Sequence, residues 1–181
     1  FCDKDEVELW MMNDNPFLTE EQQAEWHSLY LNSNLGHKVK ILPRVKSHEE
    51  VAEIMSKCDV GVFPSRAEGW NLEALEMMSM GKYVILTNYS AHTEFATHIN
   101  SKLIHIDDTE DAYDGIWFHG QGQWASLGDR QVEQLIASMR SLHERKRSDI
   151  KSGRANKNER GIVTAKKFSW DNCCENIMRF C

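Results

Sequence analysis

The stretch VGVFPSRAEGWNLEALEMMSMGKYVIL, Val60 to Leu86, decides the fold of this chain. Its first four residues are an apolar run that Pro64 ends, as expected of a short buried strand. Proline, glycine and small polar residues then favour a loop. Asn71 is a preferred helix N-cap residue, and Gly81 follows the apolar helical pattern where a left-handed backbone is needed. With YVIL as the next strand, the stretch predicts a right-handed βαβ unit in a parallel sheet.

The rest of the chain alternates strand and helix signals in the same way. Strands are predicted at 7–12, 39–42, 60–63, 83–86 and 102–106, and helices at about 19–34, 47–57, 71–80, 93–98, 129–144 and from 168. The polar, charged residues 145–167 are expected to form a solvated helix and a connection. We expect residues 107–114 to form an acidic turn, and residues 115–128 to form a loop that anchors on the core by its aromatic side chains or else acts as a lid. This alternation predicts the α/β class, with an open, mostly parallel sheet and helices on both faces.

Two glutamates, Glu68 and Glu76, stand eight positions apart across the junction between the loop and the helix. In parallel sheets, ligands bind beyond the carboxyl ends of the strands, and a helix N-terminus there offers N–H groups to a phosphate. Carboxylates repel phosphate, but they accept hydrogen bonds from sugar hydroxyls. The combination favours a nucleotide-sugar over ATP or NAD.

The segment PSRAEGWNLEALEMMSMGKYVI resembles the E-x7-E signature of retaining GT-B glycosyltransferases of the group 1 or GT4 class, which reads like PSxxEGFGLPxLEAMAxGxPVI. The departures are Trp70, Asn71, Glu73 and Tyr83. The resemblance extends through VKILPRVKSHEEVAEIMSKCDVGVF upstream and FSWDNCCENIMRF near the end. It implies a Rossmann-like domain that forms one half of a GT-B fold.

The resemblance also implies residue roles. Glu76 would hold the ribose hydroxyls, and Glu68 would contact the donor sugar as the catalytic residue. The sugar and diphosphate would meet backbone N–H groups of Gly69, Trp70, Asn71 and Leu72. The base would be bordered by Pro43, Arg44 and Val45.

The implied activity is transfer of a sugar, with retention of configuration, from a nucleotide-diphosphate donor to a hydroxyl of an acceptor glycan or glycoprotein. GDP-mannose is the favoured donor, with UDP-sugars next, and neither a metal nor a cofactor is expected. Residues 1–181 are expected to be a donor-binding domain, with a C-terminal helix at 168–181. The acceptor-binding N-terminal domain and the first βα unit are expected to be missing, so that the chain alone binds only the donor. Two alternatives stay open: a non-catalytic module that binds nucleotide-sugar, and a nucleotide-sugar epimerase of related fold.

Composition limits the other functions. A net charge of −7 argues against a nucleic-acid or anionic-membrane partner, and no apolar run reaches the roughly 18 residues of a transmembrane segment. The five cysteines form neither a disulfide framework nor a zinc motif, which favours reduced thiols in the cytoplasm. Asp3-Lys-Asp5 has the D-x-D pattern of metal-dependent sugar transferases, but it is expected to be a solvated turn. Four cations are expected near the ligand end of the sheet: Arg44, Lys46, Arg66 and Lys82.

Overall fold

A computed structural model describes residues 1–180, and the chain divides after Val51 into two compact units. The first unit contains β1 (Leu9–Met11), α1 (Glu20–Leu31), the 3-10 helix η1 (Gly36–Lys38), β2 (Val39–Ile41) and the start of α2 (His48–Lys57). Strands β1 and β2 pair in parallel, with Leu9 opposite Val39. A capping box begins α1, because the Thr19 hydroxyl accepts from the Gln22 backbone amide and the Gln22 side chain accepts from the Thr19 backbone amide.

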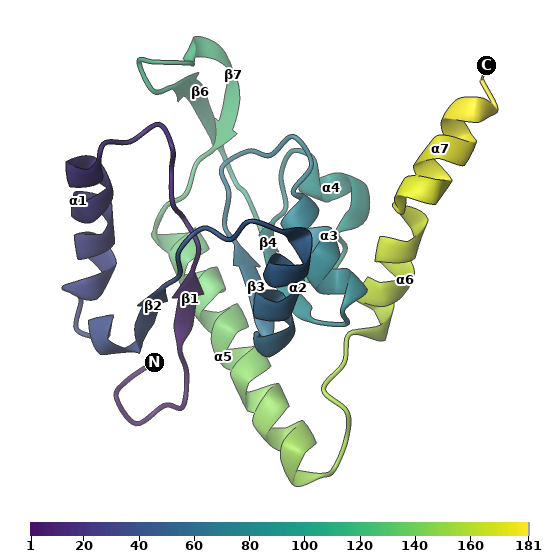
Figure 1. Cartoon of the computed structure of the whole chain (residues 1–181), viewed down its shortest axis with the longest axis horizontal. Coiled ribbons are helices and arrows are strands. Elements are labelled where there is room, and N and C mark those ends of the chain that lie inside the picture. The colour runs from purple at the N-terminus through teal and green to yellow at the C-terminus, as the bar shows by residue number, and fades with distance from the viewer. Residues whose placement is uncertain (181) are drawn as a thin grey trace. The chain divides into compact units, whose positions relative to one another are not determined.

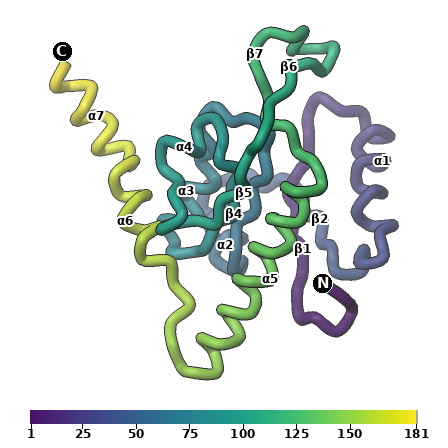
Figure 2. The backbone as a smooth tube through the Cα atoms, turned by 180° about the vertical axis from the view of Figure 1, so that it is seen from behind, coloured from purple at the N-terminus to yellow at the C-terminus, as the bar shows by residue number. Residues whose placement is uncertain are grey.

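The second unit is built on a parallel three-stranded sheet (Figures 1 and 2). Its strands are β3 (Val60–Phe63), β4 (Tyr83–Thr87) and β5 (Lys102–Ile104), in the order β3-β4-β5. Helix α3 (Leu72–Ser79) connects β3 to β4, and the short α4 (His92–Phe95) follows β4. The predicted βαβ unit and the parallel sheet are therefore confirmed.

Side chains of β4 alternate between two apolar clusters, one on each face of the sheet, as the period of a strand requires. Val84 and Leu86 pack with Met78 and the rest of the α3 face, while Ile85 packs with Leu142 of α5 (Asp129–Lys151) on the other face. Both clusters are almost fully buried. Helices thus cover both faces of this sheet, as the hydrophobic pattern predicts.

Residues 107–128 are not the turn and loop expected from the sequence, since they form an antiparallel hairpin. Its strands are β6 (Thr109–Tyr113) and β7 (His119–Ala125). Acidic residues have low strand propensity, but cross-strand pairing and the turn chemistry override that preference. The Asp114 carboxylate accepts three backbone N–H groups, from Ile116, Trp117 and Phe118, and so fixes the turn.

Residues 145–167 form the end of one helix, a connection and a further helix, which agrees with the solvated helix and connection predicted there. Helix α5 continues to Lys151, seven residues beyond its predicted end, and is followed by α6 (Glu159–Lys167) and α7 (Trp170–Met178). In the last turns of α5, Asp149 is buried and pairs with Arg145 and Arg154. No helix within residues 1–180 is both long and apolar enough to cross a membrane.

Candidate functional site

The N-terminus of α3 begins at the residue that the sequence predicts. The Asn71 side-chain oxygen accepts from the Ala74 amide at 3.0 Å, which satisfies one of the free N–H groups of the first turn. Asn71 has φ 66° and ψ 73°, in the left-handed region that asparagine tolerates better than most residues. This conformation turns the chain sharply from the loop into the helix.

Glu68 is held by groups from two loops that follow neighbouring strands. Its carboxylate accepts from the Ser65 hydroxyl at 2.6 Å and from the side-chain Nδ2 of Asn71 at 3.4 Å. Its backbone N–H donates to the Ser90 hydroxyl at 2.8 Å, and Ser90 itself has a positive φ of 50°. Because the loops after β3 and β4 meet at the carboxyl edge of the sheet, Glu68 lies where parallel sheets bind ligands.

His92 is fully buried behind this loop and joins it to the end of β4. The Thr87 carbonyl lies 2.9 Å from Nδ1 and can only accept, so Nδ1 carries the proton. Nε2 of His92 then accepts from the side-chain Nδ2 of Asn71 at 2.8 Å. Burial lowers the pKa of His92, although its hydrogen bond to Thr87 and the Glu68 carboxylate act in the opposite direction. His92 is therefore a neutral hydrogen-bonding group that positions Asn71.

This arrangement predicts a pH dependence of stability. The pKa of His92 in the folded chain lies below the ordinary value of about 6.5 that applies when unfolded. Below that pH the unfolded state binds a proton that the folded state does not, so the free energy of unfolding falls as pH decreases towards the folded pKa. Urea denaturation between pH 8 and 5, compared with His92→Gln, should show a steeper loss in the wild-type protein. Equal slopes for both proteins would contradict the assignment.

The remaining motif residues of this unit differ in how far their side chains and backbone are exposed to solvent. Glu76 is half-buried one turn into α3, and within residues 1–180 its carboxylate has no hydrogen bond or ion pair. Open space surrounds the α-carbon of Gly69, which leaves its backbone accessible, and Leu72 is exposed. The Trp70 ring packs against Phe95 and Phe168 at 5.8 and 5.3 Å between centroids, so its side chain has a structural role.

Two of the cations expected near the ligand do not provide a free positive charge there. Arg66 lies in the loop after β3, but its guanidinium pairs with Glu110 of the hairpin. Lys82 directly precedes β4 and therefore lies at the amino edge of the sheet, where its ammonium donates to the Ser56 carbonyl. The prediction that Lys82 lies near the ligand is therefore wrong, because the residue follows the C-terminal end of α3, which is opposite to the site.

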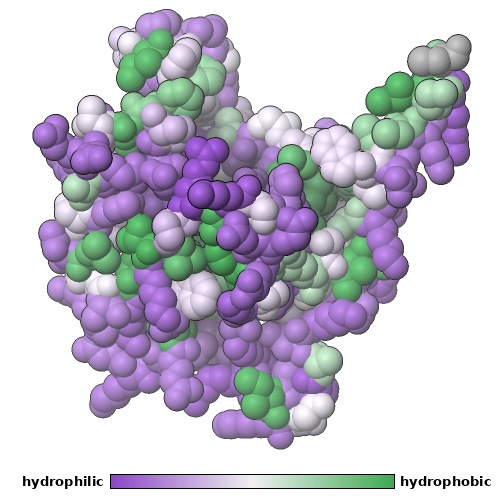
Figure 3. Space-filling model, in the orientation of Figure 1, coloured by the Kyte–Doolittle hydropathy of each residue, from purple (hydrophilic) through white to green (hydrophobic). Residues whose placement is uncertain are grey.

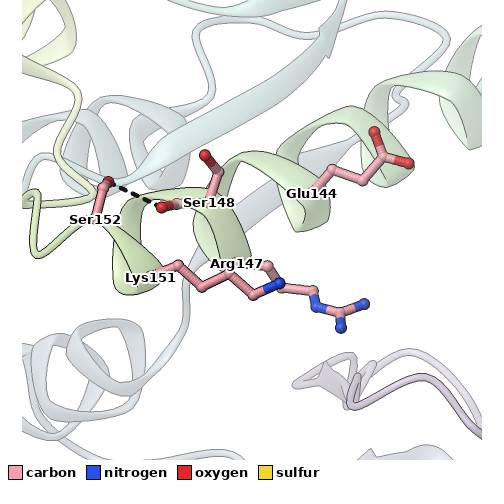
Figure 4. A pocket seen from close by; sticks show the side chains of 5 residues that line it. All are labelled: Glu144, Arg147, Ser148, Lys151 and Ser152. Carbon is pink, nitrogen blue, oxygen red and sulfur yellow. Dashed lines mark hydrogen bonds between the residues drawn. The ribbon is translucent and has the colours of Figure 1, made fainter.

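Pro43, Arg44 and Val45 belong to the first unit, in the loop between β2 and α2. Pro43 and Arg44 line a shallow depression of that unit together with Asp14, His27, Ile41 and Leu42. Another depression is formed by one face of α5 and its C-cap (Figure 4). It contains none of the predicted site residues, and its side chains come from a single stretch of helix: Glu144, Arg147, Ser148, Lys151 and Ser152.

Sequence reasoning missed three residues that build the site. Ser65 and Ser90 bind Glu68 directly, and Thr87 orients His92. Ser65 belongs to the Pro-Ser pair that opens the motif, which is a signal that could have identified it. Ser90 and Thr87 lie on a different loop and carry no local signal.

The parallel sheet with helices on both faces, and the glutamate loop at its carboxyl edge, define this chain as a Rossmann-like α/β domain. Residues 2–117 match the model of the family Glycosyl transferases group 1, and this match covers more than half of the chain. The chain belongs to that family. It is also 27% identical over 149 residues to an uncharacterized glycosyltransferase from Methanocaldococcus jannaschii. That alignment covers 82% of this chain but 34% of the relative, so the chain spans about a third of the relative's length.

Proposed function

We propose that this chain is the donor-binding part of a retaining GT-B glycosyltransferase of the GT4 class. The observation that carries the proposal is the Glu68 loop, held by Ser65, Asn71 and Ser90 directly before the N-terminus of α3. A helix N-terminus suits a diphosphate, and carboxylates beside it suit sugar hydroxyls. Family membership supports the same chemistry.

In this proposal Glu68 contacts the donor sugar and Glu76 binds the ribose hydroxyls. Backbone N–H groups from Gly69 to Leu72 meet the sugar and the diphosphate, and their fixed dipoles stabilise the leaving group without a metal ion. Pro43, Arg44 and Val45 border the base. The acceptor, a glycan or glycoprotein, binds to a further domain of the longer protein that would contain this chain. GDP-mannose is the donor we favour, on the motif resemblance alone.

Calorimetric titration of the chain with GDP, GDP-mannose, UDP and UDP-glucose, each with and without EDTA, tests the proposal. We expect binding of one nucleotide class, unchanged by EDTA. Loss of binding in EDTA would contradict the metal-independent assignment. If the natural full-length protein, titrated in the same way, bound none of the four ligands, donor binding itself would be contradicted. Product formation by that protein only in the presence of an acceptor separates a transferase from an epimerase, which forms product from the donor alone.

Replacing Glu76 with alanine should weaken nucleotide binding by about 1 to 3 kcal/mol, because ribose hydroxyls would lose a charged acceptor. The same titration measures the change. Glu133→Ala is the matched control, since Glu133 is an exposed glutamate of α5 in the same unit. An affinity for Glu76→Ala equal to that of the control would remove the ribose assignment.

A further inference from the structure

The β6–β7 hairpin follows β5 and extends beyond the carboxyl edge of the β3-β4-β5 sheet (Figures 1 and 2). Four large side chains near its tip are exposed to solvent: Tyr113, Ile116, Trp117 and Phe118. Figure 3 shows hydrophobic residues mixed with hydrophilic ones at this end of the molecule. The base of the hairpin, in contrast, is fixed to the rest of the second unit by contacts from the same two loops that hold Glu68. The hairpin and the candidate site are thus mechanically connected.

Arg66 makes the first connection, through four interactions. Its guanidinium pairs with Glu110 of β6 and lies over the Trp124 ring of β7, 4.6 Å from the ring centroid. Its Nε donates to the Ala125 carbonyl at 3.4 Å, and its own carbonyl accepts from the Ala125 amide at 2.8 Å. Planar guanidinium geometry allows pairing, stacking and donation at the same time, which a lysine ammonium cannot do.

Tyr89 makes the second connection, because its hydroxyl donates to the Gln123 carbonyl of β7 at 3.0 Å. Both anchors are close in sequence to the groups that hold the glutamate. Arg66 precedes Glu68 by two residues, and Tyr89 directly precedes Ser90, whose hydroxyl accepts from the Glu68 amide. A movement of the hairpin base would therefore move both the loop that contains Glu68 and the loop whose Ser90 holds it.

We propose that Arg66 is a positioning residue, which uses the hairpin to fix the place of Glu68 relative to the donor sugar. This inference rests on the proposed function. The nucleotide would be bound chiefly by Glu76 and the α3 N-terminus, which Arg66 does not contact. Loss of Arg66 should then reduce turnover more than nucleotide affinity, because a displaced sugar reacts slowly even when it is bound.

The test compares the natural full-length protein with Arg66→Ala and Arg66→Lys, using GDP-mannose or UDP-glucose as the donor. We expect kcat to fall about tenfold or more in both variants, while the affinity for GDP or UDP changes less than about twofold. Arg147→Ala, an arginine exposed on α5, should retain the wild-type kcat. Full activity in Arg66→Lys would overturn the inference, because charge alone would then be sufficient.

A spectroscopic measurement keeps the test independent of folding defects. In protein labelled with 5-fluorotryptophan, the fluorine NMR signal of Trp124 is assigned by its loss in Trp124→Phe. The chemical shift of this signal should change when the donor binds to the wild-type protein. The change should be absent in Arg66→Lys. If the wild-type protein binds no nucleotide-sugar, the proposed function fails and the inference with it. If it binds and transfers sugar but the Arg66 variants retain kcat, only the inference is overturned.

Discussion

Replacing Asn71 with alanine is expected to lower the free energy of unfolding by about 2 to 4 kcal/mol. Alanine removes the N-cap acceptor for the Ala74 amide and leaves the buried Nε2 of His92 without its donor. It also places a side chain without local hydrogen bonding at φ 66°, where left-handed backbone costs roughly 1 kcal/mol or more. Denaturant unfolding monitored by circular dichroism measures the loss.

Two further substitutions separate these causes. Asn71→Gly relieves the backbone strain but still lacks the cap and the donor, so it should be more stable than Asn71→Ala. Asn71→Asp keeps the cap acceptor and a residue type that tolerates this backbone, but it cannot donate to His92. If all three variants unfolded like the wild-type protein, the network around Asn71 would have no energetic role.

The βαβ unit was predictable because each of its signals is local. Apolar runs define β3 and β4, Asn71 caps α3, and Gly81 adopts φ 75° directly after the C-cap of the helix. None of these features depends on a distant contact. The parallel order of the strands then follows from the connection through the helix.

The sequence did not predict the hairpin, because the acidic residues around its turn outweighed the turn signal itself. Asp114-Gly115 is a turn pair often found in hairpins, and Gly115 has φ 76°. The acidic residues around it favour solvent, so sequence alone indicated a turn with no strands. Arg66 and Tyr89 hold β6 and β7 to the site. Arg66 is 44 residues from its partner Glu110 in sequence, and no local pattern encodes such a pairing.

The candidate site was predictable only in its centre. The spacing of Glu68 and Glu76 identified the loop and the helix, but the groups that orient Glu68 come from separate elements. Ser90 is 22 residues from Glu68, and His92 is 21 residues from Asn71. Their roles emerge only when the loops after β3 and β4 meet at the edge of the sheet.

Replacing Glu68 with glutamine should reduce sugar transfer by about 100-fold or more, if Glu68 positions the donor sugar as proposed. The glutamine oxygen can still accept from the Ser65 hydroxyl and from the Asn71 amide, so the loop should keep its conformation. What the variant loses is the negative charge that strengthens hydrogen bonds from sugar hydroxyls. Stability should therefore change by less than about 1 kcal/mol, whereas kcat falls.

Three measurements on the natural full-length protein distinguish this outcome from a structural defect. Initial rates give kcat, titration with GDP or UDP gives nucleotide affinity, and denaturant unfolding gives stability. Glu94→Gln is the control, because Glu94 is an exposed glutamate of α4 in the same unit. Transfer by Glu68→Gln within twofold of this control would remove Glu68 from the mechanism. Unchanged nucleotide affinity together with lost transfer would indicate that Glu68 acts on the sugar. The two carboxylates of the motif, Glu68 and Glu76, would then have separable roles.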